Sequence, residues 1–107
     1  MIRATTPTHT FTFPQDIAPA DCDKILITYK QGNKKVLEKT EEDLTIGEKS
    51  VSYTFSQEDT KLFTDREKAS VQMRVLLLTG EALASDIMQF SIKPVLNDEV
   101  LTNELGT

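Results

Sequence analysis

The sequence predicts an all-β domain in which two antiparallel sheets enclose a single core. Three observations support this class. The β-branched residues Thr, Ile and Val number 14, 7 and 6 among 107 residues, and such side chains suit a pleated sheet better than a helix. Several segments alternate apolar and polar side chains with a period of two. Turn-forming residues separate these segments at short intervals, as in two-layer β-sandwiches.

The first predicted strand is Thr8–Phe13, with threonines on one face and His9, Phe11 and Phe13 on the other. Residues 14–23 contain two prolines and three aspartates, so they are predicted to form a connecting loop with room for one short helical turn. We therefore expect a half-buried strand that ends at a proline.

A hairpin is predicted next, because Gly32 and Asn33 supply the positive φ angles of a two-residue turn. Its strands are Lys24–Gln31 and Lys34–Thr40, and a two-residue turn places Tyr29 opposite Val36. The reverse face is less polar than a solvated sheet face, a first indication of a covered surface. The predicted core face holds Ile25, Ile27, Tyr29 and Val36, and the reverse face holds Leu26, Thr28 and Leu37.

In the middle of the chain, the sequence pattern predicts two strands followed by a short helix. Leu44–Ile46 suits a short edge strand, and Ser50–Phe55 is the clearest alternating strand of the sequence. Ser56 and Asp59 have the spacing of a helix cap, which predicts a short helix near residues 56–63 whose last two residues cover the core. A capped helical turn between strands is the crossover used by immunoglobulin-like sandwiches, and we predict that architecture with about six to seven strands.

A second, longer hairpin is predicted from Ser70–Thr79, the Gly80-Glu81 turn and the returning segment Ala82–Lys93. A two-residue loop would place Asp86 on the core face, where an unpaired carboxylate is costly. Either a bulge near Ala84-Ser85 turns this side chain outward or it bonds to a loop, and the sequence leaves both open. The predicted core pairs are Leu77 with Ala84, Met73 with Met88, and Val71 with Phe90.

Two groups of apolar residues are candidates for contact with a partner. One lies on the reverse face of the long hairpin, which is more apolar than a solvated face. The other lies in residues 95–107, which we separate as a C-terminal tail from the sandwich domain 1–94. The tail has helical spacing and is either a frayed end or a peptide that docks on a neighbouring subunit. The candidate contact residues are Leu76, Leu78, Leu83, Ile87, Leu96, Val100, Leu101 and Leu105.

Charge and composition argue against several classes of partner. The formal net charge is −5, and the longest basic cluster is the pair Lys34-Lys35, so nucleic acid is a poor partner. The longest aliphatic run is Val75–Leu78, far short of the roughly twenty residues of a membrane span. Residues 1–20 lack the apolar stretch of an export signal, and Cys22 is the only cysteine. We therefore expect a protein that stays in a reducing cytoplasm where it is made.

No motif in the sequence indicates catalysis or a cofactor. His9 is the only histidine and has no zinc-ligand spacing around it. The acidic run Glu41–Asp43 lacks the alternating oxygen ligands of a calcium loop and is predicted to be solvated. A triad of Ser85, His9 and Asp86 has no supporting spacing, and four glycines leave no phosphate-binding loop. We expect no catalytic residue, no metal site, no cofactor and no enzymatic activity.

Five stretches of the sequence carry a resemblance to a known group: Met1–Arg3, Thr6–Phe11, Ile27–Tyr29, Val36–Asp43 and Ala82–Asp86. Together they resemble small uncharacterised prophage proteins of Gram-positive, gut-associated bacteria, over most of the chain. The resemblance implies a phage structural or tail-associated protein, present in the host cytoplasm during assembly and then in the virion. Immunoglobulin-like domains of phage tails, baseplates and capsid decorations bind neighbouring subunits or host-surface polymers. No catalytic residue is known for this group, and none is transferred.

The function expected from the sequence is therefore that of a non-enzymatic assembly module acting through protein–protein contacts. Its partners would be other phage structural proteins or a second copy of the chain. The alternative is a carbohydrate- or cell-surface-binding module, which would need exposed aromatic side chains. The chain has no Trp, and both Tyr29 and Tyr53 fall on predicted core faces, which argues against this alternative. An enzyme is the third class and would need a pocket with convergent polar groups.

Overall fold

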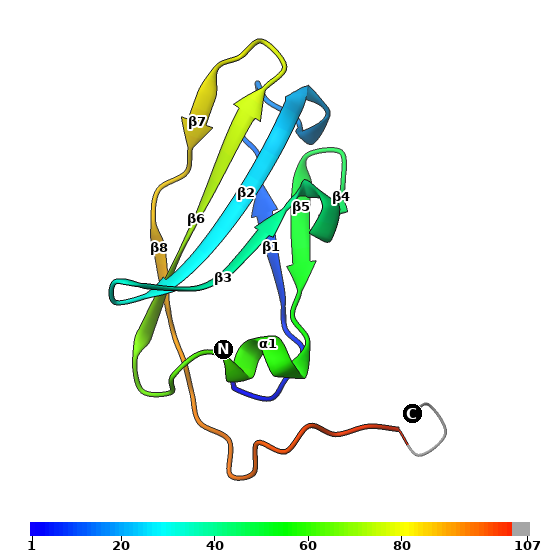
Figure 1. Cartoon of the computed structure of the whole chain (residues 1–107). Helices are drawn as coiled ribbons and strands as arrows, with labels where there is room; N and C mark the ends of the chain where they lie inside the picture. The colour runs from blue at the N-terminus through cyan, green and yellow to red at the C-terminus, as the bar shows by residue number, and fades with distance from the viewer. Residues whose placement is uncertain (104–107) are drawn as a thin grey trace.

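Two antiparallel sheets pack face to face in the computed structural model, which describes residues 1–103 (Figure 1). The larger sheet has the order β3-β2-β6-β7, with β8 also paired to β6, and the smaller has the order β1-β5-β4. The predicted all-β sandwich is confirmed, with eight strands in the described residues because the last predicted strand divides in two. The elements are β1 Thr8–Thr12, β2 Cys22–Gln31, β3 Lys34–Thr40, β4 Thr45–Ile46, β5 Ser50–Thr54, α1 Gln57–Lys61, β6 Lys68–Leu77, β7 Ala82–Ala84 and β8 Met88–Ser91.

The core forms where alternate side chains of the two sheets meet, as the period of two predicts. Ile27, Tyr29 and Val51 are completely buried, and Phe55 and Phe63 are nearly so. The ring of Tyr29 meets those of Phe55 and Phe63 edge to face, with centroids 5.2 and 5.9 Å apart. Such pairs add to the stability that apolar burial supplies. The predicted inward faces of β1, β2 and β5 are confirmed.

The β2–β3 hairpin follows the predicted register only next to its turn. Gly32 has a φ of +58°, as the two-residue turn requires. The pairing shifts by one residue between Tyr29 and Lys30, so Tyr29 lies opposite Leu37 and not opposite Val36. This bulge brings both Val36 and Leu37 against the core. The prediction that Leu37 lies on the reverse face is therefore wrong.

The loop between β1 and β2 is held by a lysine that directly precedes β5, the neighbour of β1 in the smaller sheet. The Nζ atom of Lys49 donates to the carbonyls of Pro14, Gln15 and Ile17 at 2.9, 3.1 and 2.5 Å. The helical turn of this loop is a single 3₁₀ turn at residues 19–21, three positions after the turn predicted near residues 16–18. A proline at its first position favours this start, because its missing N–H costs no hydrogen bond there.

The β6–β7 connection differs from the predicted tight turn. Strand β6 ends at Leu77 and β7 begins at Ala82, and Gly80 in the connection has a φ of +94°. Leu83 therefore lies opposite Val75. A longer loop shifts the register, so the residues of the returning strand meet other partners than a two-residue turn would give them. The predicted pairs Leu77 with Ala84, Met73 with Met88, and Val71 with Phe90 are all wrong.

A serine side chain divides the returning strand into β7 and β8. The backbone amide of Ser85 donates to the carbonyl of Met73 at 2.8 Å, and the amide of Met73 donates to Oγ of Ser85 at 3.0 Å. The hydroxyl thus replaces the backbone carbonyl that would continue the ladder. Asp86 follows and is exposed. Of the two predicted alternatives for Asp86, the irregularity that turns it outward is the one observed.

Helix α1 begins as predicted, at a capping box. The amide of Asp59 donates to Oγ of Ser56, and the amide of Ser56 donates to the carboxylate of Asp59, each at 3.1 Å. The hydroxyl of Tyr53 donates to the same carboxylate, which ties α1 to β5. After the helix, Phe63 is buried in the core whereas Leu62 is exposed. The prediction that both residues cover the core is right for Phe63 and wrong for Leu62.

Residues 1–3 link the two sheets on the side where β8 lies. Ile2 forms a parallel bridge with Lys93, and the amide of Lys93 donates to the carbonyl of Met1 at 2.8 Å. The amino group of Met1 donates to the carbonyl of Ser91 at 2.7 Å. The chain then crosses to β1 in the smaller sheet. The end of β8 is therefore covered by backbone, while the part nearer β7 is not.

Candidate interaction surface

The sheet edges of this sandwich are protected unequally. Strand β3 carries three lysines, one glutamate and a bulge, features that prevent pairing with another chain. Strand β4 has only two residues. The border formed by β7 and β8 is interrupted between them, and residues 1–3 cover its end. Strand β1 has none of these protections and carries no Asp, Glu, Lys or Arg.

The backbone of β1 faces β5 and solvent at alternate residues. The amide of Phe13 donates to Lys49 at 2.7 Å, and the carbonyl of Pro7 accepts from Phe55 at 2.8 Å. Because hydrogen-bonded pairs alternate in an antiparallel ladder, the residues of β1 with even numbers point their N–H and C=O groups to the free edge. Within residues 1–103 these groups have no backbone partner. They belong to Thr8, Thr10 and Thr12, all exposed.

Two clefts lie one after the other along this free edge, between β1 and the border formed by β7 and β8. Strands β7 and β8 are at the left side of Figure 1. Their volumes are about 270 and 300 Å³. Met88 pairs with the core residue Val71, yet 45% of its surface is exposed, because the smaller sheet does not extend over it. We call the two clefts together the seam. It is lined chiefly by Phe11, Phe13, Met73, Leu83, Met88 and Phe90.

His9 lies in the seam, and its side chain contacts residues of the core. Its Nδ1 and the hydroxyl of Tyr29 are joined by a hydrogen bond of 2.8 Å, and its ring packs edge to face on Phe55 and Phe90 with centroids 4.8 and 5.2 Å away. Burial holds the pKa of His9 below its ordinary value, and the positive amino group of Met1 lowers it further. His9 is therefore neutral near pH 7 and acts as a structural aromatic residue.

His9 should make the stability of the domain fall in mild acid. In the unfolded chain His9 titrates near its ordinary value of 6.5, whereas the folded chain binds the proton only at lower pH. The unfolded state therefore binds more protons below about pH 6.5, and the free energy of unfolding decreases as the pH falls from about 7.5 to about 5.5. Urea melts at these two pH values measure the change.

The matched variant for this prediction is His9→Gln, which keeps a polar side chain but has no group that titrates in this range. The difference in unfolding free energy between the two pH values should shrink in the variant. The amino group of Met1 also has a lowered pKa and contributes to both proteins alike. An unchanged pH dependence in His9→Gln would show that another group causes the acid sensitivity.

The four apolar residues predicted to share the reverse face of the long hairpin do not form one surface. Leu83 points inward and packs against the core, because the longer loop shifts its register. Leu76 is half-buried, and Leu78 and Ile87 are exposed, with Leu78 in the β6–β7 connection and Ile87 in the break before β8. The prediction of a common reverse face is therefore wrong for Leu83.

The described part of the tail, residues 95–103, contains no helix, so the predicted helical spacing is not used there. Leu96 and Leu101 are exposed and Val100 is half-buried. Leu105, the last of the predicted contact residues, lies outside the described residues. The apolar side chains of the tail thus have little contact with the sandwich, which leaves both alternatives for the tail open.

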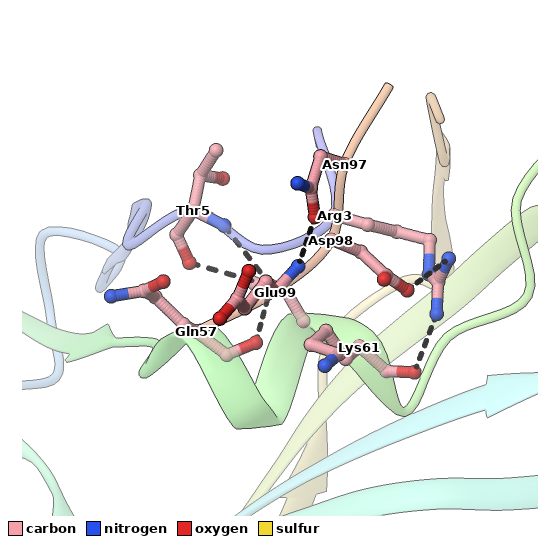
Figure 2. Close-up of polar contacts among 8 residues, drawn as sticks. Arg3, Thr5, Gln57, Lys61, Asn97, Asp98 and Glu99 are labelled. Carbon is pink, nitrogen blue, oxygen red and sulfur yellow. Dashed lines mark hydrogen bonds and ion pairs between the residues drawn. The ribbon is translucent and has the colours of Figure 1, made fainter. Parts of the chain in front are cut away.

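Polar contacts hold this tail beside α1 and the start of the chain. Figure 2 shows Arg3 between the tail and the helix: it forms an ion pair of 3.4 Å with Asp98 and donates to the carbonyl of Lys61 at 3.2 Å. The side-chain amide of Gln57 donates to the carbonyl of Leu101 and accepts from its amide, both at 2.8 Å. The carboxylate partner Asp98 is 46% exposed, and ion pairs with a solvated partner are weak, so this pair contributes little stability.

The residues of the triad considered in the sequence, Ser85, His9 and Asp86, form no hydrogen bonds between their side chains. His9 bonds to Tyr29, whereas Oγ of Ser85 bonds to the backbone of Met73 and Asp86. Among residues 1–103 no group of three His, Cys, Asp or Glu side chains has the arrangement of a metal site. The same residues include no helix long and apolar enough to span a bilayer.

The comparisons with known proteins gave no match. No protein-family model matches the chain, and neither the curated proteins nor the solved structures contain a significant match.

The seam was not predicted from the sequence, although one signal for it was present. The alternation of side chains shows which face of Thr8–Phe13 points to the core. It does not show the order of strands in the sheet, and that order decides whether a strand has a free edge. The available signal was the lack of charge in a strand bounded by Pro7 and Pro14. Prolines occur at sheet edges because they cannot donate to a ladder.

Proposed function

We propose that the chain is a non-enzymatic structural or assembly module of a phage particle, acting through protein–protein contacts. The seam is the observation that supports the proposal most directly. A free, uncharged strand edge beside exposed apolar side chains promotes unwanted association, and domains that work alone normally protect such edges. The other edges of this sandwich are protected and β1 is not. An unprotected edge suits a domain whose role is to bind a neighbour.

The phage origin rests on the resemblance of five stretches of sequence to small prophage proteins. Some of those stretches form the surface now in question, since Met1–Arg3 covers the end of β8 and Thr6–Phe11 contains most of β1. We therefore propose other structural proteins of the particle as partners.

A carbohydrate-binding role has less support. Sugar-binding sandwiches stack rings of the ligand on exposed aromatic side chains. In this chain Tyr29, Tyr53 and four of the five phenylalanines are buried. The fifth, Phe90, is half-buried and packs on His9, Tyr29 and Phe63. No flat aromatic surface is therefore presented to a polysaccharide.

The experiment that tests the proposal is the composition of purified particles. A bacterial strain that carries the encoding prophage is induced, the particles are purified by density, and their proteins are quantified by mass spectrometry. We expect the chain in the particles at a fixed ratio to the major tail or capsid protein. A replication protein of the same phage serves as the control that should not co-purify. A chain found in the lysate but absent from the particles would contradict the proposal.

A further inference from the structure

We propose that the seam binds one extended segment of another polypeptide, which adds to the free edge of β1 as a fourth strand of the smaller sheet. The inference rests on the proposed function, because it describes how that function's binding surface receives its partner. Added strands of this kind gain affinity from backbone hydrogen bonds and specificity from alternate side chains.

The backbone of β1 fixes the length of the added strand. Thr8, Thr10 and Thr12 each direct an N–H and a C=O group away from β5, and none of these groups has a backbone partner within residues 1–103. Pro7 and Pro14 bound the strand, and proline cannot donate to a ladder. The added strand therefore pairs over about five residues, enough for a specific contact.

The inner side of the seam fixes the side-chain pattern of the partner. A strand beside β1 places every second side chain over the larger sheet, where β7 and β8 extend beyond the smaller sheet. There it meets Met88, which is 45% exposed, and the half-buried Leu83 and Phe90. Those partner positions must be apolar, since a charge buried there would be unpaired. The intervening positions lie beside the exposed threonines of β1 and are small and polar.

Charge complementarity fixes one end of the partner. Strand β1 is uncharged, but the positive amino group of Met1 bonds to Ser91 at the end of β8 and acts electrostatically on His9. An acidic residue at that end of the partner is therefore favoured. Neither the tail nor β1 of a second copy fits this pattern, because the consecutive acids Asp98 and Glu99 lie in the middle of the apolar residues of the tail and β1 contains no acidic residue. We therefore assign the seam to a segment of a different protein.

A random heptapeptide library displayed on a carrier is the probe for this site. The whole chain is immobilised, and retained peptides are sequenced. We expect the retained peptides to alternate apolar and small polar residues and to contain an acidic residue at one end. In the complex with the best peptide, hydrogen exchange at the amides of Thr10 and Thr12 should slow by about tenfold or more. The amides of His9 and Phe11, already paired with β5, should change little.

Two exposed apolar residues on opposite faces supply a matched pair of variants. Met88→Lys places a charge in the seam and should weaken peptide binding by about tenfold or more. Ile87→Lys adds the same charge at the neighbouring position, 64% exposed and outside the two clefts, and should leave binding unchanged. Met88 is 45% exposed and Ile87 64%, so neither lysine is buried in the core and both variants should fold. Thr10→Pro removes an N–H that β5 does not use and should also abolish binding.

The outcomes separate this inference from the proposed function. If no peptide is retained, or if binding is insensitive to both Met88→Lys and Thr10→Pro, the seam does not accept a strand and the inference is wrong. A dimer in light scattering that Thr10→Pro dissociates would assign the edge to a second copy and would also overturn it. In either case the chain could still be found in purified particles. Absence from particles would contradict the proposed function, whatever the peptides show.

Discussion

Replacing Phe55 by alanine is expected to lower the free energy of unfolding by about 3 to 5 kcal/mol. Phe55 is 1% exposed and lies at the centre of the aromatic cluster. Its ring centroid is 5.0 Å from that of Tyr53 and 4.8 Å from that of His9. Truncation removes this apolar burial and leaves a cavity between the sheets. The loss is a large part of the 5 to 15 kcal/mol typical of a whole domain, and urea melts measure it.

Leu62→Ala is the matched control for Phe55→Ala. Leu62 is a large apolar residue in a neighbouring part of the chain, but 57% of its surface is exposed. Its removal should change the free energy of unfolding by less than about 0.5 kcal/mol. Equal effects of the two truncations would mean that the side chain of Phe55, which follows β5, does not lie in the core.

Replacing Gln31 by leucine is expected to cost about 2 to 3 kcal/mol, although the new side chain is apolar and of similar size. Gln31 is only 9% exposed. Its Oε1 accepts the amide of Thr64 at 2.7 Å, and its Nε2 donates to the carbonyl of Thr64 at 2.8 Å. Leucine removes both hydrogen bonds to Thr64, and the net contribution of each is about 1 to 1.5 kcal/mol. Urea melts again provide the measurement.

Gln89→Leu is the control for this variant, because Gln89 is exposed on β8 and should tolerate the change within about 0.5 kcal/mol. A second readout is hydrogen exchange at the amide of Thr64, which should become faster in Gln31→Leu and stay unchanged in Gln89→Leu. If the Gln31 variant melts like the parent protein, the connection between α1 and β6 is held by other contacts.

The inward faces of the strands could be predicted because alternation is a local property. Ile25, Ile27 and Tyr29 follow a period of two and are all buried. The same period places Gln31 on the inward face, and a polar residue there signals a hydrogen bond to a loop. The capping box at Ser56 is equally local, since it depends on two residues three positions apart.

The two hairpins were predicted, but the register of their strands could not be, because single residues outside the alternation decide it. A bulge beside Tyr29 brings Leu37 to the core, and the longer connection after β6 moves Leu83 opposite Val75. The hydroxyl of Ser85 takes the place of a backbone carbonyl and ends β7. Because the register differs, the predicted apolar reverse face of the long hairpin does not form. The seam depends on the order of strands in the sheets, and no local sequence pattern determines that order.

The pairing of β2 with β6 has a consequence for how the chain acquires its fold. These two strands form the centre of the larger sheet and join Cys22–Lys30 with Ser70–Leu77, so the sheet is complete only when residues far apart in sequence have met. Topologies dominated by such distant contacts fold slowly, in about milliseconds to seconds. During synthesis the β2–β3 hairpin remains without its central neighbour until β6 has left the ribosome, and for that interval it is exposed to aggregation.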